Sequence, residues 1–353
     1  MCSLEPNNIT RPAMLTLSIC IPTRNRSAHL RNCINSIVCA TMQTNVKFQI
    51  CISDNNSSDN SEQVVRDAQV RIGIDYNKND TNIGFARNLL KVVSMAESDY
   101  VWVVGDDDLL IPSALTRLCQ LIARHPQVDF FYVNSYLLST DFIDRYPAPF
   151  DTANLPSLMP RISKWEIEGE LPFLDLINPD VSFDFLGGIF LSVFRKHNWD
   201  LNTHVLNGAA LMDDRVQSHF DNTFPQIKIF ANAYRSSRAY FNAAPLIVSL
   251  SGSSTREWAP MYPLVRSVRL LQGLQAYRSK GLPYWKYLRC KNRALEHFVP
   301  DLIRLLLDRE NSGYRYINPL LLVLESFLFP NFYLSVICLV GRKLRSLTSQ
   351  TTR

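Results

Sequence analysis

Three consecutive aspartates, Asp106, Asp107 and Asp108, follow an apolar run in the segment YVWVVGDDDLLIP. Adjacent carboxylates repel one another, so holding them at the end of a strand is costly unless a cation neutralises them. Mg²⁺ and Mn²⁺ do this through oxygen ligands, and they commonly bridge one or two carboxylates to substrate phosphates. The triplet therefore indicates a divalent-cation site. The alternative is an acidic loop or the first turn of a helix, where aspartate is also favoured.

Two earlier loops carry residues that suit a nucleotide. In CIPTRNRS, Pro22 is expected to stop a strand, and Arg24 and Arg26 can face phosphates or stack on a base plane. In CISDNNSSDN, Asp54 can accept a hydrogen bond from a nucleobase or a ribose hydroxyl, or it can simply form a side-chain turn. Arg87 in NIGFARN is a further basic candidate, with a solvated charge on a helix face as the alternative.

Alternating apolar patterns predict the elements that would position these residues. β-rich runs lie at 15–21, 48–54, 72–76, 100–104 and 129–138, and stripes with helical spacing lie between them. Such alternation favours an α/β fold with a mostly parallel sheet covered by helices. Ligands bind beyond the carboxyl ends of strands in these sheets. Thr23, Asn25, Asp54 and the triplet should therefore crowd one rim.

The second half of the chain has weaker patterns. Residues 139–180 are expected to form a long connection, and 181–196 and 226–250 are expected to contain further strands. From about residue 262 the chain is expected to be helical and basic. No internal repeat is visible.

The segment 317–345 is strongly apolar but is interrupted by Glu325, Pro330 and Asn331. Neither half reaches the roughly 18 to 20 apolar residues that a membrane span needs. Two interpretations remain. One is a buried core helix, and the other is a helix on the inner membrane surface, anchored by Arg342, Lys343 and Arg345.

The composition is that of a globular protein. The 353 residues are 46% hydrophobic and 20% charged, with a net charge of +5, which fits one large or two ordinary domains. No run of Lys and Arg resembles a nucleic-acid stripe, so no nucleic-acid partner is expected. The eight cysteines form no CxxC pair, and no basic segment followed by an apolar one opens the chain. We therefore expect reduced cysteines, no signal peptide and a cytoplasmic location.

The segments SICIPTRNR, ICISDNNSSD, NIGFARN and SDYVWVVGDDDLLIP occur in the order found in glycosyltransferase family 2, which the first 140 residues or so resemble. That resemblance implies the GT-A fold and a nucleotide-sugar donor. Within the family the chain looks most like O-antigen sugar transferases of the abequosyltransferase type, because of FRKHNWD and Gly187–Gly188.

The resemblance also implies residue roles. Asp107 would be the main ligand of Mg²⁺ or Mn²⁺, Asp108 a neighbouring metal-site acid, and Asp106 a ribose contact. The residues that would surround the rest of the nucleotide are Pro22, Thr23, Arg24, Asn25, Asp54 and Arg87. Two positions depart from the family pattern. Gly105 replaces the first acid of the usual D-x-D-D, and Arg24 replaces an aromatic residue, which suggests stacking by the guanidinium.

Members of the family are generally inverting, so the resemblance implies one general base. Its expected place is the acid pair Asp213 and Asp214 in GAALMDDRVQSHF, with a helix N-terminal acid pair as the alternative and Asp184 in reserve. His219 could approach the metal or diphosphate, or be structural. The loop SGSSTREW, 251–258, could close over a ligand through Arg256 and Trp258, or be an ordinary surface loop.

The leading hypothesis is a metal-dependent transferase that adds a sugar to a lipid-linked glycan acceptor, peripheral on the inner face of the cytoplasmic membrane. The likeness points to a CDP-linked donor, with the base left open. The expected parts are a nucleotide-sugar half (1–140), an acceptor and catalytic half of the same domain (141–260) and a helical region (261–353). The alternatives are a sugar-1-phosphate nucleotidyltransferase, which IPTRNRS disfavours because it lacks glycine, and a non-catalytic nucleotide-sugar-binding protein.

Overall fold

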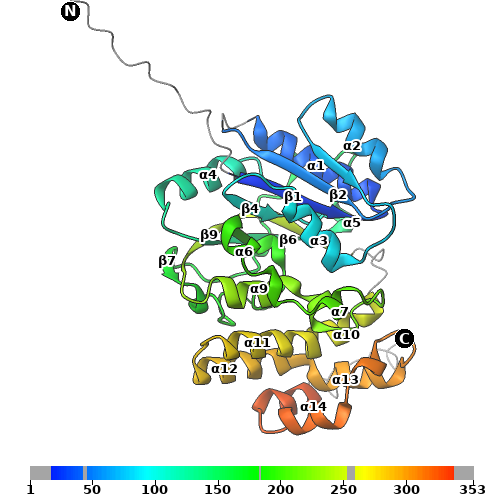
Figure 1. The fold of residues 1–353 in the computed structure, drawn as a ribbon, viewed down its shortest axis with the longest axis vertical. Helices are drawn as coiled ribbons and strands as arrows, with labels where there is room; N and C mark the ends of the chain where they lie inside the picture. Colours follow the sequence, from blue (N-terminus) through cyan, green and yellow to red (C-terminus); the bar gives the residue numbers. More distant parts are fainter. Residues whose placement is uncertain (1–16, 43–45, 183, 253–258, 338–353) are drawn as a thin grey trace, which may run out of the picture.

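A single mixed sheet organises the molecule (Figure 1). The computed structural model describes residues 17–42, 46–182, 184–252 and 259–337. Within them the strand order is β3-β2-β1-β4-β8-β6-β9-β5, and β7 pairs with β9. The strands are β1 (Leu17–Thr23), β2 (Gln49–Asp54), β3 (Asp75–Lys78), β4 (Tyr100–Val103), β5 (Asp108–Leu110), β6 (Phe130–Ser139), β7 (Gly169–Pro172), β8 (Ser192–Arg195) and β9 (Arg238–Ser251).

The first half of the sheet is parallel, as the alternation of strand and helix patterns predicts. Strand β1 pairs in parallel with β2 and β4, and β2 pairs in parallel with β3. Strand β8 enters antiparallel between β4 and β6, while β9 runs parallel to β6 and pairs antiparallel with β5 and β7. The expected helix-covered α/β architecture is confirmed.

Helices cover both faces because strand residues alternate between two cores. Ile19 and Ile21 belong to the core under α1, α2 and α4, whereas Cys20 belongs to the core under α3, α9 and α11. The helices are α1 (Ser27–Thr41), α2 (Ser61–Gln69), α3 (Phe85–Ser94), α4 (Ala114–Arg124), α5 (Thr140–Ile143), α6 (Lys196–Asp200), α7 (Gly208–Leu211), α8 (Phe220–Thr223) and α9 (Pro225–Ala233).

A helical layer follows β9 and lies at the lower end of Figure 1. It consists of α10 (Tyr262–Leu264), a π-helical turn (Val265–Arg269), α11 (Leu270–Ser279), α12 (Tyr284–Ala294), α13 (Phe298–Leu307), α14 (Pro319–Ser326) and the helix Pro330–Ile337. Leu274 and Tyr277 of α11 share a core with Ile227 and Phe230 of α9. This layer is therefore packed directly against the helices that cover the sheet.

Two strand boundaries differ from the sequence-based expectation. Pro22 does not stop the first strand, because β1 continues to Thr23 in register with Asp54. The pairing of β1 with β4 ends at Cys20. The edge of β1 that faces β4 therefore needs no backbone N–H donor at Pro22. The third strand lies at Asp75–Lys78 and not at 72–76, since Ile74 instead packs into the core before the strand begins.

Two longer predictions were partly wrong. Among the described residues of 181–196, only Ser192–Arg195 forms a strand, and the buried Phe185 and Leu186 adopt positive φ in a turn. In 226–250 the first part is helix α9, so its apolar residues follow helical spacing. The expected long connection, 139–180, holds α5 and β7. Burial of apolar side chains, which is common to these segments, does not by itself distinguish strand from turn or helix.

In the described part of the chain, no single helix has the length and apolarity to cross a membrane. Helices Pro319–Ser326 and Pro330–Ile337 pass that test only as a pair, and they are bent by 112° at the break between them. The proposed anchors Arg342, Lys343 and Arg345 lie outside the described residues. The six described cysteines are all free thiols.

Candidate active site

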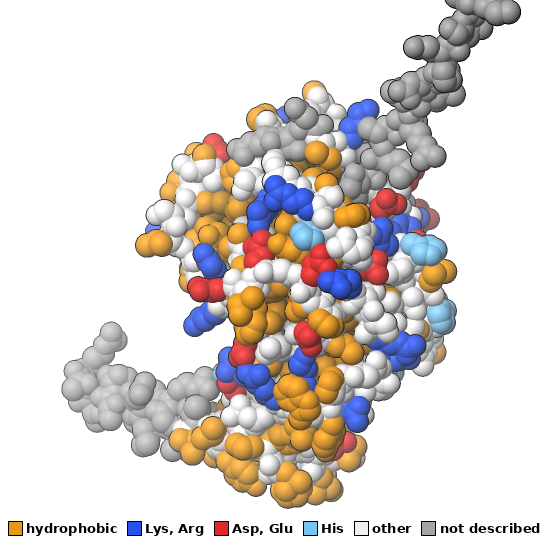
Figure 2. Space-filling model, turned by 90° about the vertical axis from the view of Figure 1, so that its left-hand side faces the viewer, with side chains coloured by type: hydrophobic (Ala, Val, Ile, Leu, Met, Phe, Trp, Pro, Cys, Tyr) orange, Lys and Arg blue, Asp and Glu red, His pale blue; other side chains and the backbone are white. Residues whose placement is uncertain are grey.

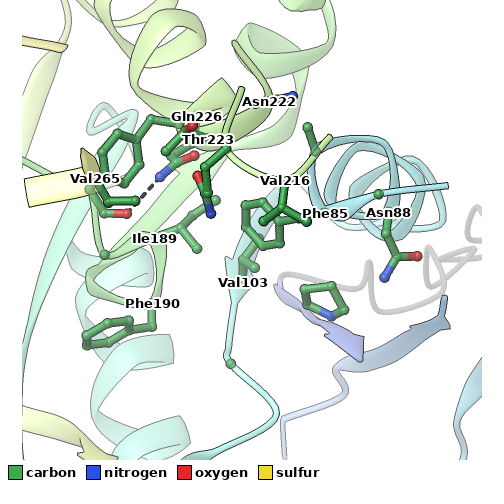
Figure 3. A pocket seen from close by; sticks show the side chains of 18 of the residues that line it. Phe85, Asn88, Val103, Ile189, Phe190, Val216, Asn222, Thr223, Gln226 and Val265 are labelled. Atoms are coloured by element: carbon green, nitrogen blue, oxygen red, sulfur yellow. Dashed lines mark hydrogen bonds between the residues drawn. The ribbon is translucent and has the colours of Figure 1, made fainter. Parts of the chain in front are cut away.

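The loops after β1, β2 and β4 leave the same edge of the sheet. Thr23 and Asp54 are paired at the ends of β1 and β2, and the Val104 N–H donates to the Cys20 carbonyl at 2.9 Å. A cavity of about 820 Å³ opens at this edge. Figure 3 shows Val103 of β4 and Phe85 at the start of α3 on its wall, with Thr223 coming from α8 and Gln226 from α9.

Most of the expected site residues line this cavity. They are Pro22, Thr23, Arg24, Asn25, Arg87, Asp106, Asp107, Asp108, Asp213 and Asp214, and the reserve acid Asp184 is also among them. The exception is Asp54, which is fully buried. Its Oδ1 accepts from the Ser57 N–H and its Oδ2 from the Tyr76 hydroxyl, both at 2.8 Å. A nucleobase contact by Asp54 stays a prediction.

The acidic triplet has built-in partners that hold two of its members together. Thr23 Oγ1 donates to Asp106 Oδ2 at 2.8 Å, and Arg26 Nη2 donates to Asp107 Oδ2 at 2.7 Å. The same guanidinium places Nε 3.1 Å from Asp106 Oδ1. These side chains are largely buried, at 16% exposure for Arg26 and 9% and 10% for the two aspartates. Arg26 thus neutralises part of the charge of the triplet.

The departure at Gly105 has a steric reason. A Cβ at this position would lie 2.7 Å from Asp108 Oδ2, closer than real Cβ atoms approach, and 3.0 Å from Asp107 Oδ1, which is a tight contact. Asp108 Oδ2 accepts from the Gly105 N–H at 3.0 Å. Two carboxylate oxygens therefore converge on the space that a side chain at 105 would fill.

This convergence suits a hard divalent cation, which takes oxygen ligands and commonly uses one or two carboxylates together with phosphate oxygens. Within the described ranges, no group of three or more His, Cys, Asp or Glu side chains is arranged to hold a metal. The donor set of Asp107 and Asp108 therefore fits a cation that completes its coordination with the oxygens of a bound ligand.

Asn25 connects the loops after β1 and β2. It has φ of 52°, in the left-handed region that asparagine tolerates better than most residues. Its Oδ1 accepts from the Ser58 N–H at 2.8 Å, and its own N–H donates to Ser57 Oγ at 2.8 Å. Asn25 therefore positions the neighbouring Arg24, which lines the cavity.

Arg87 spans the cavity from α3 to the loop that carries the acid pair. Its Nη2 donates to Asp214 Oδ1 at 2.8 Å, and its Nε donates to the Ile83 carbonyl. The arginine side chain is 24% exposed and that of Asp214 is 81% exposed. The structure thus joins a residue expected to contact the nucleotide with an acid expected to activate the acceptor.

Asp213 is fixed by its own loop. Its carboxylate accepts from Arg215 Nη2 at 2.7 Å and Ser218 Oγ at 2.8 Å, and His219 Nε2 lies 3.0 Å away. The hydrogen bonds from Arg215 hold the pKa of Asp213 well below its usual range. A carboxylate with a lowered pKa is a weak base, so these contacts suit anchoring of the loop better than proton transfer. His219 does not itself line the cavity among the described residues.

Asp184 lies beneath the glycine pair that follows it. Its carboxylate accepts from Ser182 Oγ and from the Gly188 N–H, both at 2.7 Å. Burial raises its pKa, although these hydrogen bonds oppose the rise. A Cβ at Gly188 would lie 2.9 Å from Asp184 Oδ2, so glycine is needed for the close approach.

The sequence did not reveal the part of the wall that comes from the helical layer. Tyr262, Arg266, Arg293 and His297 line the same cavity as the triplet. The Arg266 guanidinium is held by the fully buried Asp301, with Nε to Oδ2 at 2.9 Å and Nη2 to Oδ1 at 2.6 Å. These residues come from several short helical elements, including the π-helical turn that holds Arg266, and no sequence motif marks them. The loop residues Arg256 and Trp258 lie outside the described residues.

Known proteins resemble the first part of the chain in sequence. Residues 18–163 match the family model for glycosyl transferase family 2. The chain is 39% identical over 106 residues to the abequosyltransferase RfbV of Salmonella typhimurium, covering 30% of this chain and 32% of that protein. It is 34% identical over 110 residues to the GalNAc(5)-diNAcBac-PP-undecaprenol beta-1,3-glucosyltransferase of Campylobacter jejuni, covering 30% and 34%. These matches span about a third of the length of each curated relative.

A solved structure resembles the fold over more of the chain. It is S. aureus TarS 1-349 in complex with UDP, with a TM-score of 0.50 and 13% identity, covering 86% of this chain and 76% of that one. At this identity the likeness concerns the fold alone. The strand order, the cavity at the carboxyl ends of the strands and the family match lead to one conclusion. Residues 18–163 resemble glycosyltransferase family 2, and the chain has a fold of the GT-A type.

Proposed function

We propose that the protein is a metal-dependent, inverting glycosyltransferase that moves a sugar from a nucleotide-sugar donor to a hydroxyl of a lipid-linked glycan in O-antigen or surface-polysaccharide biosynthesis. One observation carries the proposal. A single cavity is lined by the acidic triplet after β4, by the basic loop after β1 and by the acids Asp184, Asp213 and Asp214. Donor-binding and proton-accepting groups therefore face a common space.

The loops at the sheet edge would bind the donor. Arg24 and Arg87 on the cavity wall would contact the base and the diphosphate, and Asp106 the ribose. Asp107 and Asp108 would hold Mg²⁺ or Mn²⁺, which when bound offsets the negative charge of the departing nucleoside diphosphate. Asn55 lines the cavity, whereas the buried Asp54 does not, so Asn55 is the better placed of the two to contact a base.

For the general base, we propose that the two adjacent acids have different roles. Asp213 would anchor the loop through Arg215 and Ser218, and Asp214 would take the proton of the acceptor hydroxyl. The hydroxyl oxygen forms its bond to the anomeric carbon while the bond from that carbon to the diphosphate breaks. Asp184 remains the reserve, because burial raises its pKa but both of its oxygens already accept hydrogen bonds.

The helical layer supports an amphiphilic acceptor and a peripheral position on the inner face of the cytoplasmic membrane. Arg293 and His297 line the cavity at the junction of α12 and α13. Directly beside them, Asn331 donates to both the side-chain and main-chain oxygens of Asn292, at 3.0 and 2.8 Å, and the Phe298 and Phe332 rings are 5.7 Å apart. The apolar helix Pro330–Ile337 therefore adjoins the end of the cavity that Arg293, Glu296 and His297 line.

That helix and α14 expose much apolar surface. The most exposed large side chains of this region are Leu320 (69%) on α14, Ile337 (65%) on the last helix and Leu328 (79%) in the break between them. Figure 2 shows hydrophobic side chains gathered over the lower end of the molecule, where these helices lie. A contiguous exposed apolar patch marks a protein or membrane contact. A lipid-linked acceptor would place its lipid here and its phosphates near the arginines.

Thermal unfolding with a panel of nucleoside diphosphates, with and without Mn²⁺ or Mg²⁺, tests the donor site. A ligand at 100 times its Kd stabilises the folded state by about 2.7 kcal/mol. We expect one nucleotide to stabilise the protein only with metal, and Asp107→Ala to abolish this. CDP is included because it is the nucleotide expected from the sequence. Asp180→Ala, at an exposed acid paired with Arg289, is the matched control. No metal-dependent stabilisation by any nucleotide would contradict the proposal.

Transfer activity separates an enzyme from a binding protein. Asp214→Asn should keep metal-dependent nucleotide binding and reduce transfer about 10²- to 10⁴-fold, the range of general-base catalysis. Release of pyrophosphate from a nucleoside triphosphate and a sugar 1-phosphate would instead identify a nucleotidyltransferase.

A further inference from the structure

Arg269 is a buried arginine at the end of the π-helical turn in the helical layer. Only 3% of the residue is exposed. Burial lowers its pKa to about 10, so it still carries its charge at neutral pH, and within the described part of the chain no carboxylate pairs with it. A buried charge without an opposite charge is costly and is seldom found in proteins. The contacts that Arg269 makes must therefore offset this cost.

Those contacts run to the loop 213–218, which carries the proposed base. Arg269 Nη2 donates to the Ser218 carbonyl at 2.6 Å and to the Gln217 carbonyl at 2.9 Å. Its Nε donates to the same Gln217 carbonyl at 3.3 Å, and its Nη1 donates to Gln272 Oε1 at 2.9 Å. A guanidinium presents its donors in a fixed, planar arrangement. Arg269 thus joins two successive carbonyls of this loop to the start of α11.

Gln217 shows why the loop needs such a partner. Its φ is 55°, in the left-handed region that few residues other than glycine and asparagine adopt. A conformation of this kind persists only where the surrounding structure fixes it, and such residues cluster at active sites. Two hydrogen bonds from Arg269 reach the Gln217 carbonyl. Arg269 therefore stabilises a strained backbone conformation at a residue that lines the cavity.

A second contact ties the same loop to the helical layer. The Arg215 guanidinium lies 5.6 Å from the centroid of the Tyr316 ring, in the short connection before α14. By contrast, the side chain of Asp214 is 81% exposed, and it accepts a hydrogen bond from Arg87 on the donor side of the cavity. The helical layer therefore fixes the main chain of the loop, whereas the carboxylate of Asp214 projects from it.

Resting on the proposed function, we infer that Arg269 is a positioning residue for proton transfer, which holds the loop 213–218 at the cavity wall so that Asp214 faces the acceptor hydroxyl. Arg269 is not among the described residues that line the cavity, so it acts through the loop and not on a substrate. The donor-binding residues lie on the loops after β1, β2 and β4. Loss of Arg269 should therefore impair turnover and leave donor binding intact.

Amide hydrogen exchange, followed by mass spectrometry, tests the contact without any activity assay. Full-length wild type is compared with Arg269→Met and Arg269→Lys. The matched control is Arg278→Met, at an arginine that also donates to a carbonyl of the helical layer, that of Leu282. In Arg269→Met we expect peptides covering 213–218 to exchange about tenfold faster or more, and peptides covering 55–60 to be unchanged. Arg269→Lys should lie between, since an ammonium group can donate to a carbonyl but lacks the planar fork.

Transfer kinetics separate positioning from general support of the fold. Arg269→Met should lower kcat about 10- to 100-fold, the cost of a misplaced catalytic group. The KM for the nucleotide sugar and the thermal shift induced by the nucleotide should not change. In an Asp214→Asn background, the same substitution should lower kcat less than about twofold, because the group that Arg269 positions is already absent.

Each other outcome overturns a different claim. Unchanged exchange of 213–218 in Arg269→Met would refute the inference and leave the transferase intact. Loss of nucleotide binding in both Arg269 variants would mean that Arg269 supports the whole fold, and it would refute the inference too. Equal losses of kcat in wild type and in Asp214→Asn would exclude action through Asp214. Wild type that binds no nucleotide and transfers no sugar would overturn the proposed function, whatever the exchange of the loop.

Discussion

At the first position of the family's acidic motif this chain has Gly105, and its missing Cβ leaves room for oxygens of Asp107 and Asp108. The carboxylates are the ends of flexible side chains, so they can turn away from an added methyl group. If they turn, the two carboxylates no longer point toward the same position. The effect of a side chain at 105 should therefore fall on ligand binding more than on folding.

Gly105→Ala should reduce metal-dependent nucleotide binding strongly while costing only about 1 kcal/mol of unfolding free energy, the low end for overpacking. Denaturant unfolding and the nucleotide-induced thermal shift measure the two effects separately. Gly73→Ala is the matched control, because a Cβ there meets nothing within 4 Å. Unchanged nucleotide binding in Gly105→Ala would mean that Asp107 and Asp108 do not converge on a ligand.

Asp213 gives a prediction of pH dependence. Its pKa is lowered in the folded protein, mainly by hydrogen bonds from Arg215. The ionised carboxylate therefore contributes stability that is present above about pH 4, the ordinary aspartate pKa, and is lost as the pH falls below it. The difference in unfolding free energy between wild type and Asp213→Asn should be largest near neutral pH and shrink in acid. Asp80→Asn, at an exposed aspartate, controls for the loss of one charge. A difference that stays constant from pH 7 to pH 3 would contradict this account.

At the scale of elements, the basic loop after β1 and the loop after β2 behave as one unit. Asn25 joins them through its side chain and main chain, and it does so from a left-handed backbone conformation. Two separate effects, conformational strain and a hydrogen bond, therefore meet at one residue.

Two substitutions separate these effects. Asn25→Gly removes the bond to the Ser58 N–H but keeps the backbone conformation accessible, whereas Asn25→Ala loses both. We expect Asn25→Ala to be the less stable of the two by about 1 kcal/mol, and both to bind nucleotide more weakly than wild type. Urea unfolding and nucleotide titration check this. Equal stability of the two variants would show that the left-handed conformation is not strained.

The sequence predicts the parallel part of the sheet well, because strands such as β1 and β2 are buried on both faces and read as short apolar runs. It fails where apolar residues fill a buried turn, as at Phe185 and Leu186. It also missed β5, whose three residues begin inside the triplet. Local patterns report burial, and tertiary contacts decide the conformation of short segments.

The candidate site was predictable only in part for a similar reason. Thr23 and the triplet could be predicted as site residues because they follow strands of the parallel sheet. Ligands bind beyond the carboxyl ends of such strands. One partner of Asp107 is Arg26, which lies 81 positions away in the chain. From the sequence, Arg26 is predicted only to contact a phosphate or a base. Arg266 and Asp301 belong to helices without any motif, so nothing local links them to the cavity.

At the scale of the whole molecule, the cavity and the exposed apolar helices adjoin each other in the helical layer. The packing of Pro330–Ile337 against α12 and α13 is made by Asn331 and Phe332, so the residues that stay exposed are not needed for that contact. Folding and surface contact can thus be tested separately.

A triple variant, Leu320→Ser, Leu328→Ser and Ile337→Ser, should fold normally and lose sedimentation with vesicles of phosphatidylethanolamine and phosphatidylglycerol. Burial of apolar side chains in the lipid interface provides the binding energy, so removing three of them weakens it. The control replaces Val70 and Leu158, which are 88% and 90% exposed elsewhere, with serine. Undiminished sedimentation of the triple variant would mean that these helices do not bind the membrane.

The family match ends at residue 163, whereas the cavity wall continues to His297. The cavity wall therefore draws both on the matched stretch of the chain and on the stretch that follows it. Under the proposed function, selection for a new acceptor can rewrite the later stretch while the earlier one keeps its donor. Chimaeras that join the first 163 residues to the remainder of a relative should keep this protein's nucleotide preference and take on the relative's acceptor. Diversity of surface glycans would then arise by exchange of the stretch after residue 163.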